Sequence, residues 1–124
     1  MAFFIADWFR IQARAAFEEG KSVVVDNTNP DRATRAEWLD LARQMGVKQT
    51  RCFVLTTPRE LCNHLNLYRE YSSNVRRIPD IAFNMFKSRY VEPDVSEGFS
   101  HVTHVDFSLQ LKSESEKEMF LKWQ

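Results

Sequence analysis

The chain has 124 residues, 44% of them hydrophobic, which is enough for one domain with a modest core. Its 17 basic and 17 acidic residues cancel, so no overall charge favours nucleic acid or anionic lipid, and any basic site must be local. Cys52 and Cys62 lack metal-ligand spacing, and Asp7 interrupts the apolar N-terminal stretch. We therefore expect a nuclear or otherwise intracellular protein with reduced thiols, no secretion signal and no membrane span.

The predicted elements alternate between helix and strand. Apolar residues at helical spacing indicate helices, and short apolar runs indicate strands. In chain order we expect a helix over 3–19, a strand over 22–26, a helix over 31–45, a strand over 50–56, a helix from 59, a mobile polar loop over 70–78, a helix from 79, a strand over 101–107 and a helix from 113. This order is typical of a parallel α/β sheet with right-handed crossovers.

The stretch over 23–30, Val-Val-Val-Asp-Asn-Thr-Asn-Pro, is the strongest candidate for chemistry. Three consecutive valines lack the alternation of a half-buried strand, which favours a strand covered on both faces. The polar residues then follow its carboxyl end, where ligands bind in open α/β sheets. We also expect Asn29 to cap the next helix, with Pro30 at the first helical position.

Gly20-Lys21-Ser22 precedes this stretch but is not predicted to be a phosphate loop. That motif needs another glycine five residues earlier, where Ala15 stands, and it follows a strand instead of preceding one. We interpret the three residues as the end of a helix and the start of a strand.

Several motifs, in order and spacing, resemble the kinase domain of polynucleotide kinase-phosphatases, which phosphorylate 5′-hydroxyl ends of DNA and remove 3′-phosphates. They are Val-Asp-Asn-Thr-Asn-Pro-Asp at 25–31, Arg-Cys-Phe-Val-Leu-Thr at 51–56, His-Leu-Asn-Leu-Tyr-Arg-Glu at 64–70, Ile-Pro-Asp at 78–80, Glu-Pro at 92–93 and Glu-Gly-Phe at 97–99. The resemblance covers residues 10–107. It implies that 1–124 is a single partial kinase domain, with a P-loop kinase-like parallel sheet flanked by helices and a lid near 64–78.

The family's first strand, its Gly-rich phosphate loop, its general base and its phosphatase motif have no counterpart in the sequence. The resemblance implies ATP and Mg²⁺ as cofactors of the intact enzyme and DNA with 5′-hydroxyl ends as its partner. We expect this chain to bind ATP weakly and to need an upstream segment for activity. The absent strand would lie between 22–26 and 50–56, so we expect a gap, an altered pairing or exposed sheet edges. Unless those two strands pair directly with each other, we also expect a poorly stable monomer that is prone to association.

The resemblance also implies roles for individual residues. Asp26 and Arg69 are the expected catalytic residues, with Arg69 as a lid arginine that closes over the transferring phosphate. Family members place a second lid arginine where this chain has Leu67. The cofactor-binding residues are Asn27, Thr28 and Arg69, the substrate-binding residues are Asn29, Arg35, Arg76 and Arg77, and no residue is assigned to a metal.

Three functions stay open at this point. The first is part of a polynucleotide 5′-hydroxyl kinase that is inactive as this chain alone. The second is a non-catalytic nucleic-acid-binding or scaffolding module derived from the kinase fold, and the third is a fragment of a small-molecule P-loop kinase. ATP binding, salt-dependent DNA binding and the acceptor of the phosphoryl group separate them.

Overall fold

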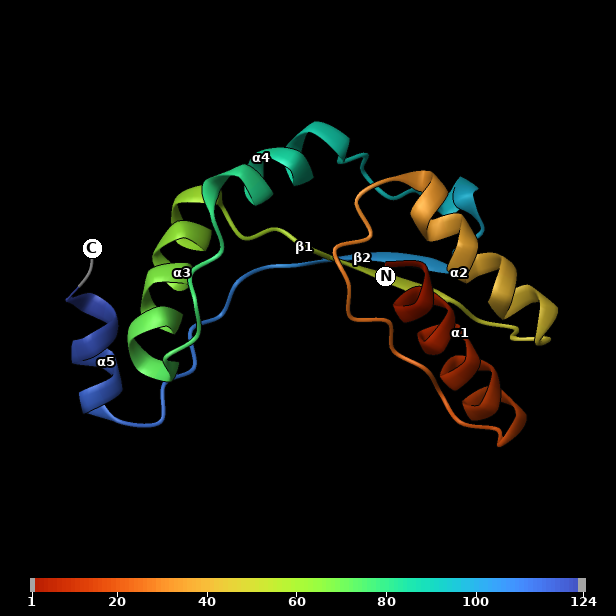
Figure 1. Ribbon diagram of the computed structural model, residues 1–124, viewed down its shortest axis with the longest axis horizontal. Helices are drawn as coiled ribbons and strands as arrows, with labels where there is room; N and C mark the ends of the chain where they lie inside the picture. The colour runs from red at the N-terminus through yellow and green to blue at the C-terminus, as the bar shows by residue number, and fades with distance from the viewer. Residues whose placement is uncertain (1, 123–124) are drawn as a thin grey trace. The chain divides into compact units, whose positions relative to one another are not determined.

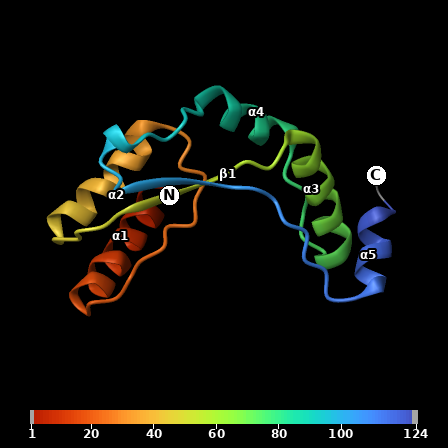
Figure 2. The ribbon, with the colours of Figure 1, turned by 180° about the vertical axis from the view of Figure 1, so that it is seen from behind.

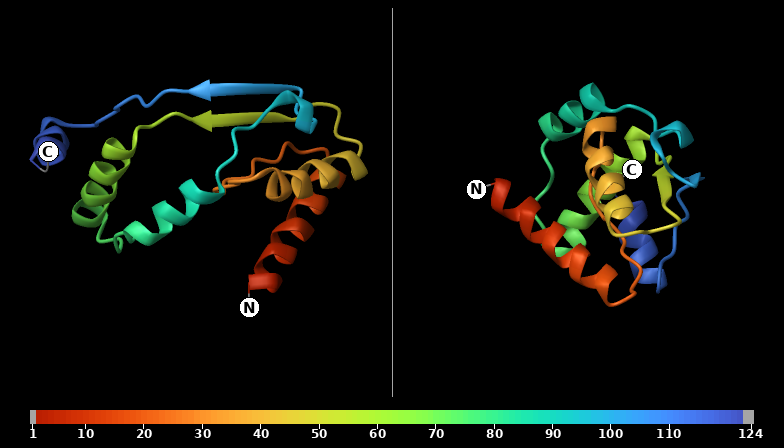
Figure 3. Two further views of the ribbon diagram at one scale, coloured as in Figure 1. Left: turned by 90° about the horizontal axis from the view of Figure 1, so that it is seen from above. Right: turned by 90° about the vertical axis from the view of Figure 1, so that its right-hand side faces the viewer.

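The computed structural model describes the backbone of residues 2–122 and the side chains of residues 7–122. Over these residues the chain forms helices and two strands (Figure 1). The elements are α1 (Ala2–Glu18), α2 (Arg32–Gln44), β1 (Arg51–Leu55), α3 (Arg59–Ser73), α4 (Asp80–Arg89), the 3-10 helix η1 (Val95–Glu97), β2 (His101–Val105) and α5 (Glu114–Leu121). β1 and β2 pair and run parallel (Figure 3), which confirms the α/β class. None of the described helices is both long and apolar enough to span a bilayer.

The described chain divides into two compact units. Unit 1 comprises residues 2–52 and Arg89–Val102, and unit 2 comprises Phe53–Ser88 and residues 103–122. Each strand begins in unit 1 and ends in unit 2. The two units are described separately below.

In unit 1, α1 lies beside α2 (Figures 1 and 2). Arg10 of α1 forms an ion pair with Glu37 of α2. The small core consists of apolar side chains from both helices: Ala13, Leu39, Leu41 and Ala42. Leu39 and Ala42 lie three residues apart and share one face of α2, as its amphipathic pattern predicts.

The start of α2 differs from the prediction. Asp31, not Asn29, is the N-cap, and its carboxylate accepts a hydrogen bond of 2.8 Å from the Thr34 amide. An N-cap residue needs extended backbone, whereas Asn29 has a φ of 39° in the left-handed region. The cap therefore lies two residues later than we expected, and Asn29 belongs to the loop before it.

The predicted strand over 22–26 is wrong. Residues 21–30 form no strand, and the Val24 side chain is 90% exposed. A strand is stable only when neighbouring backbone satisfies its hydrogen bonds, and within residues 2–122 the sole strand pair is β1 with β2. The valine run therefore has strand composition but pairs with neither strand, and one edge of β1 stays open.

In unit 2, α5 lies beside α3 (Figures 1 and 2). The Phe120 ring is 6% exposed and meets the rings of His64 and Tyr68 edge-on, with centroid distances of 4.4 and 5.4 Å. α3 continues to Ser73 and ends at Asn74 in left-handed conformation, so the polar loop begins four residues later than expected. The helix continues because Glu70 and the residues after it tolerate helical backbone.

Candidate functional site

The predicted catalytic loop lies in unit 1. Asp26, Asn27 and Thr28 are exposed, and the loop bonds mainly to itself. The Thr28 amide donates to Asn27 Oδ1 at 2.8 Å, and Asn29 Nδ2 donates to the Asn27 carbonyl at 3.3 Å. This arrangement leaves the Asp26 carboxylate and the Thr28 hydroxyl facing solvent, where a ligand can reach them.

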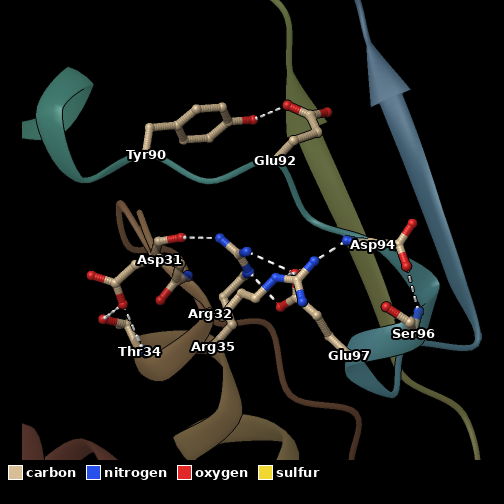
Figure 4. A network of polar contacts seen from close by, with 10 residues as sticks. Asp31, Arg32, Thr34, Arg35, Tyr90, Glu92, Asp94, Ser96 and Glu97 are labelled. Carbon is tan, nitrogen blue, oxygen red and sulfur yellow. Dashed lines mark hydrogen bonds and ion pairs between the residues drawn. The ribbon is translucent and has the colours of Figure 1, made fainter.

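A buried ion pair contacts this loop (Figure 4). The Arg35 side chain comes from α2 and is 4% exposed, while Glu97 comes from η1 and is 5% exposed. Arg35 Nε and Nη2 donate to the two Glu97 oxygens, each at 2.8 Å, and Arg35 Nη1 donates to the Asn29 carbonyl at 3.1 Å. This bidentate hydrogen bonding holds the pKa of Glu97 below its ordinary value and raises that of Arg35.

A second ion pair holds the residue that follows the loop. Arg89 donates to Asp31 Oδ2 at 2.6 Å. Hydrogen bonds from the Thr34 amide and hydroxyl, and then from Arg89, lower the pKa of Asp31 to about 2. The Val91 amide donates to the Pro30 carbonyl at 2.8 Å. The loop is therefore fixed at its C-terminal end by α2 and by the segment after α4.

The tyrosine beside this network is not a candidate base. The Tyr90 hydroxyl donates to Glu92 Oε2 at 2.5 Å (Figure 4). Burial and this hydrogen bond to a carboxylate raise the pKa of Tyr90 to about 12, so the phenol stays protonated at neutral pH. Its role in unit 1 is to hold Glu92.

The predicted lid lies in unit 2 and is organised by Asn66, which is 8% exposed. Its Nδ2 donates to the Ile78 carbonyl at 2.8 Å, and its Oδ1 accepts from the Ile78 amide at 3.0 Å. Asn66 thus pairs with Ile78 as a neighbouring strand would, and ties the loop over 74–79 to α3. Arg69 Nη2 also donates to Asn66 Oδ1, at 3.3 Å.

The three lid arginines differ in their surroundings. Arg69 is half-buried, and its buried Nε has no acceptor among the described residues. Arg77 is exposed and forms an ion pair of 2.7 Å with Glu70, and Arg76 beside it is exposed. Arg76 and Arg77 line a surface depression with Ile78 and Pro79. A cation with an unused donor and two exposed cations on one segment suit an anionic ligand.

The structure thus places the predicted residues in two groups. Unit 1 holds Asp26, Asn27, Thr28, Asn29 and Arg35, and unit 2 holds Arg69, Arg76 and Arg77. Arg35, which we expected at the substrate, has its guanidinium inside a buried ion pair. No group of three metal-ligating side chains occurs among the residues whose side chains are described.

Sequence reasoning missed two residues that organise these groups, Asn66 and Glu97. Glu97 belongs to the Glu-Gly-Phe motif, and its only sequence signal was a place in that motif. Asn66 belongs to the His-Leu-Asn-Leu-Tyr-Arg-Glu motif, and its place in that motif was likewise its only sequence signal. Its burial, which requires a hydrogen-bonding partner for the amide, could not be predicted from the helical pattern.

Comparison with known proteins identifies the family. A family model described as an AAA domain matches residues 2–93. A bifunctional polynucleotide phosphatase/kinase from Schizosaccharomyces pombe is 44% identical over 92 residues, and a putative one from Acanthamoeba polyphaga mimivirus is 40% identical over 94 residues. Each match covers 74% of this chain and 22% of the relative, so the chain spans about a fifth of their length. The chain therefore belongs to the AAA domain family, with a P-loop kinase-like α/β fold and homologues among the bifunctional polynucleotide phosphatase/kinases.

Proposed function

We propose that this chain supplies the lid and the loop over 26–29 to a polynucleotide 5′-hydroxyl kinase. Its acceptor is DNA with a 5′-hydroxyl end, its donor is the γ-phosphate of ATP, and its role is DNA end repair in the nucleus. One observation carries the proposal: Arg76 and Arg77 are exposed on the segment that follows the half-buried Arg69, so unit 2 holds three cations in one stretch of the chain. Phosphoryl transfer requires such cations, because negative charge spreads over the phosphate oxygens.

In this proposal the residues of unit 2 contact phosphate. Arg69 donates to the transferring phosphate and neutralises charge on its non-bridging oxygens. Arg76 and Arg77 contact phosphates of the substrate strand, and Arg77 exchanges its bond to Glu70 for one to the ligand. The half-buried position of Arg69 strengthens its interaction with an anion, because water screens it less.

The residues of unit 1 are proposed to contact the reacting groups. Asp26 is the catalytic carboxylate, Asn27 and Thr28 contact the nucleotide, and Asn29 lies at the substrate strand. ATP and Mg²⁺ fit the described residues only in part. The arginines suit the phosphates, whereas the described side chains form no cluster of metal ligands. When bound in the intact enzyme, ATP supplies the phosphoryl group.

The 124-residue sequence contains no Gly-rich phosphate loop, so we expect the chain by itself to be inactive. Loss of one oriented donor costs on the order of 10²–10³ in rate, and a missing phosphate loop removes several donors and a lysine. The test is transfer of labelled γ-phosphate to a 5′-hydroxyl oligonucleotide, with the S. pombe relative as the control. Transfer by this chain at a rate comparable with that enzyme would contradict the proposal.

A non-catalytic nucleic-acid-binding module is the second candidate, and the exposed Arg76 and Arg77 favour it. Such a module binds single-stranded DNA with an affinity that falls steeply as salt rises. Titration of a labelled oligonucleotide at several salt concentrations measures this. Salt-dependent binding that a 5′-phosphate does not weaken relative to a 5′-hydroxyl would favour the module over the kinase, because only the kinase site distinguishes the two ends.

A further inference from the structure

We propose that Arg35 and Glu97 form a positioning pair, which sets the backbone of Asn29 and thereby orients the side chains of Asp26, Asn27 and Thr28. In this assignment Arg35 contacts no DNA. The inference rests on the proposed function for the importance of the loop, but its structural content is tested without ligand.

The position of the Arg35 guanidinium is fixed from several sides. Two of its nitrogens donate to the Glu97 carboxylate. Glu97 Oε1 also accepts from the Asp94 amide at 3.1 Å, and Asp94 Oδ1 accepts from the Ser96 amide at 2.8 Å, so a capping box around η1 fixes the carboxylate. A guanidinium paired at two points has little freedom left. Its third contact, with the Asn29 carbonyl, therefore has a defined place.

Asn29 needs such support. Its φ of 39° lies in the left-handed region, which a residue with a Cβ adopts less readily than extended or right-handed helical backbone. The neighbouring acceptors are held in the same way, because Pro30 accepts from Val91 and Asp31 accepts from Arg89. Before Asn29 the loop bonds only within itself in the described contacts. The Arg35 bond is thus the first external anchor after the proposed catalytic side chains.

The same geometry argues against Arg35 as a DNA contact. The residue is 3% exposed, and its Nε, Nη1 and Nη2 already face Glu97 and Asn29. A phosphate would have to displace a buried carboxylate and leave it without its cation, at a high cost in free energy. Among the described residues, one other cation forms an ion pair with this carboxylate: the exposed Arg32, whose Nε lies 3.8 Å from Glu97 Oε1.

The first test compares the unliganded full chain with its Arg35→Lys and Glu97→Gln variants by NMR. We expect the Asn29 Cα and Cβ shifts to move away from left-handed values, and the Val91 amide to exchange about five- to tenfold faster. In Arg35→Lys, which keeps the charge, the amides of Leu41 and Ala42 should change less than about twofold, because α2 keeps its own hydrogen bonds. Arg43→Lys is the matched control, since Arg43 lies on the same helix and pairs with exposed Asp40.

Unchanged Asn29 and Val91 signals in variants without the ion pair would overturn the proposal. Equal acceleration at Leu41 and Ala42 in Arg35→Gln/Glu97→Gln would also overturn it, since this double variant leaves no buried charge unpaired and the pair would then be a general stabiliser of unit 1. If a single variant does not fold, Arg35→Gln/Glu97→Gln carries the same measurement, because it leaves no buried charge without a partner.

A second test separates positioning from contact. For binding to a 5′-hydroxyl oligonucleotide, loss of a phosphate contact lowers the magnitude of the slope of log K against log salt by about 0.7. Arg35→Lys should leave this slope unchanged, and a fall of that size in Arg35→Gln/Glu97→Gln would overturn the assignment. If the wild-type chain binds no oligonucleotide, the proposed function fails, while the ligand-free NMR measurement still decides the role of the pair.

Discussion

Arginine has opposite tasks in the two units of this protein. In unit 1 the Arg35 guanidinium is buried against Glu97 and its donors face protein acceptors. In unit 2 Arg69 keeps a donor without an acceptor among the described residues, and Arg76 and Arg77 are exposed. The difference shows that a match to a family arginine does not define a role. Burial and the number of acceptors nearby decide whether the cation holds the protein together or remains available to a ligand.

The largest difference between the two units should appear in stability, when the arginine side chain itself is removed. Arg35→Met leaves Glu97 buried without its cation, so we expect unit 1 to lose about 3–5 kcal/mol. Arg76→Met removes an exposed charge and should change stability by less than about 0.5 kcal/mol. Urea denaturation followed by circular dichroism measures both variants. Equal destabilisation would remove the contrast between the units.

Asn66 tests whether unit 2 also depends on a buried polar contact. Asn66→Ala removes both hydrogen bonds to Ile78, and we expect a loss of about 1–3 kcal/mol and fast exchange of the Ile78 amide. Asn63→Ala on the same helix is the control, because Asn63 is exposed and accepts only from Arg59 in the described contacts. An Ile78 amide that stays protected in Asn66→Ala would show that the loop is held by other contacts.

Acidification should act on unit 1 through its lowered carboxyl pKa values. The folded pKa of Glu97 lies below its ordinary 4.5, and that of Asp31 is about 2 against an ordinary 3.8. The two carboxylates therefore contribute fully to the free energy of unfolding above about pH 5. This contribution is lost as the pH falls through their pKa values in the folded state. The free energy of unfolding, measured from pH 6 to pH 2, should fall less steeply in Glu97→Gln than in the wild type.

The control for this measurement is Glu114→Gln, whose side chain is 83% exposed. The stability of Glu114→Gln should depend on pH as that of the wild type does. A Glu97→Gln variant whose stability falls as steeply as that of the wild type would show that the buried pair does not control the acid response.

The smallest effect is expected for single exposed arginines. Arg76→Ala should leave the fold intact and lower the magnitude of the salt slope for single-stranded DNA by about 0.7, the value for one lost phosphate contact. Exposed Arg51 in β1 provides a matched control, since Arg51→Ala removes the same charge away from the lid. Equal changes for both variants would mean that net charge, and not the lid, determines binding.

Most helices could be predicted because their apolar residues repeat at helical spacing, as in α1 and α2. The valine run over 23–25 misled the prediction, since strand composition does not provide a hydrogen-bonding neighbour. For the site, the motifs predicted roles for Asp26 and Arg69. They could not identify Glu97 as the partner of Arg35, because 62 residues separate the two in the chain.

The sequence by itself determined the family and the chemistry of the side chains, because motifs and apolar periods are local properties. Only the tertiary structure decided that residues 21–30 form no strand, that Asn66 ties the lid loop to α3, and that Arg35 is buried against Glu97. Each of these depends on which backbone and side chains meet from distant parts of the chain. Burial then determines whether a charge is available to a ligand or committed to the fold.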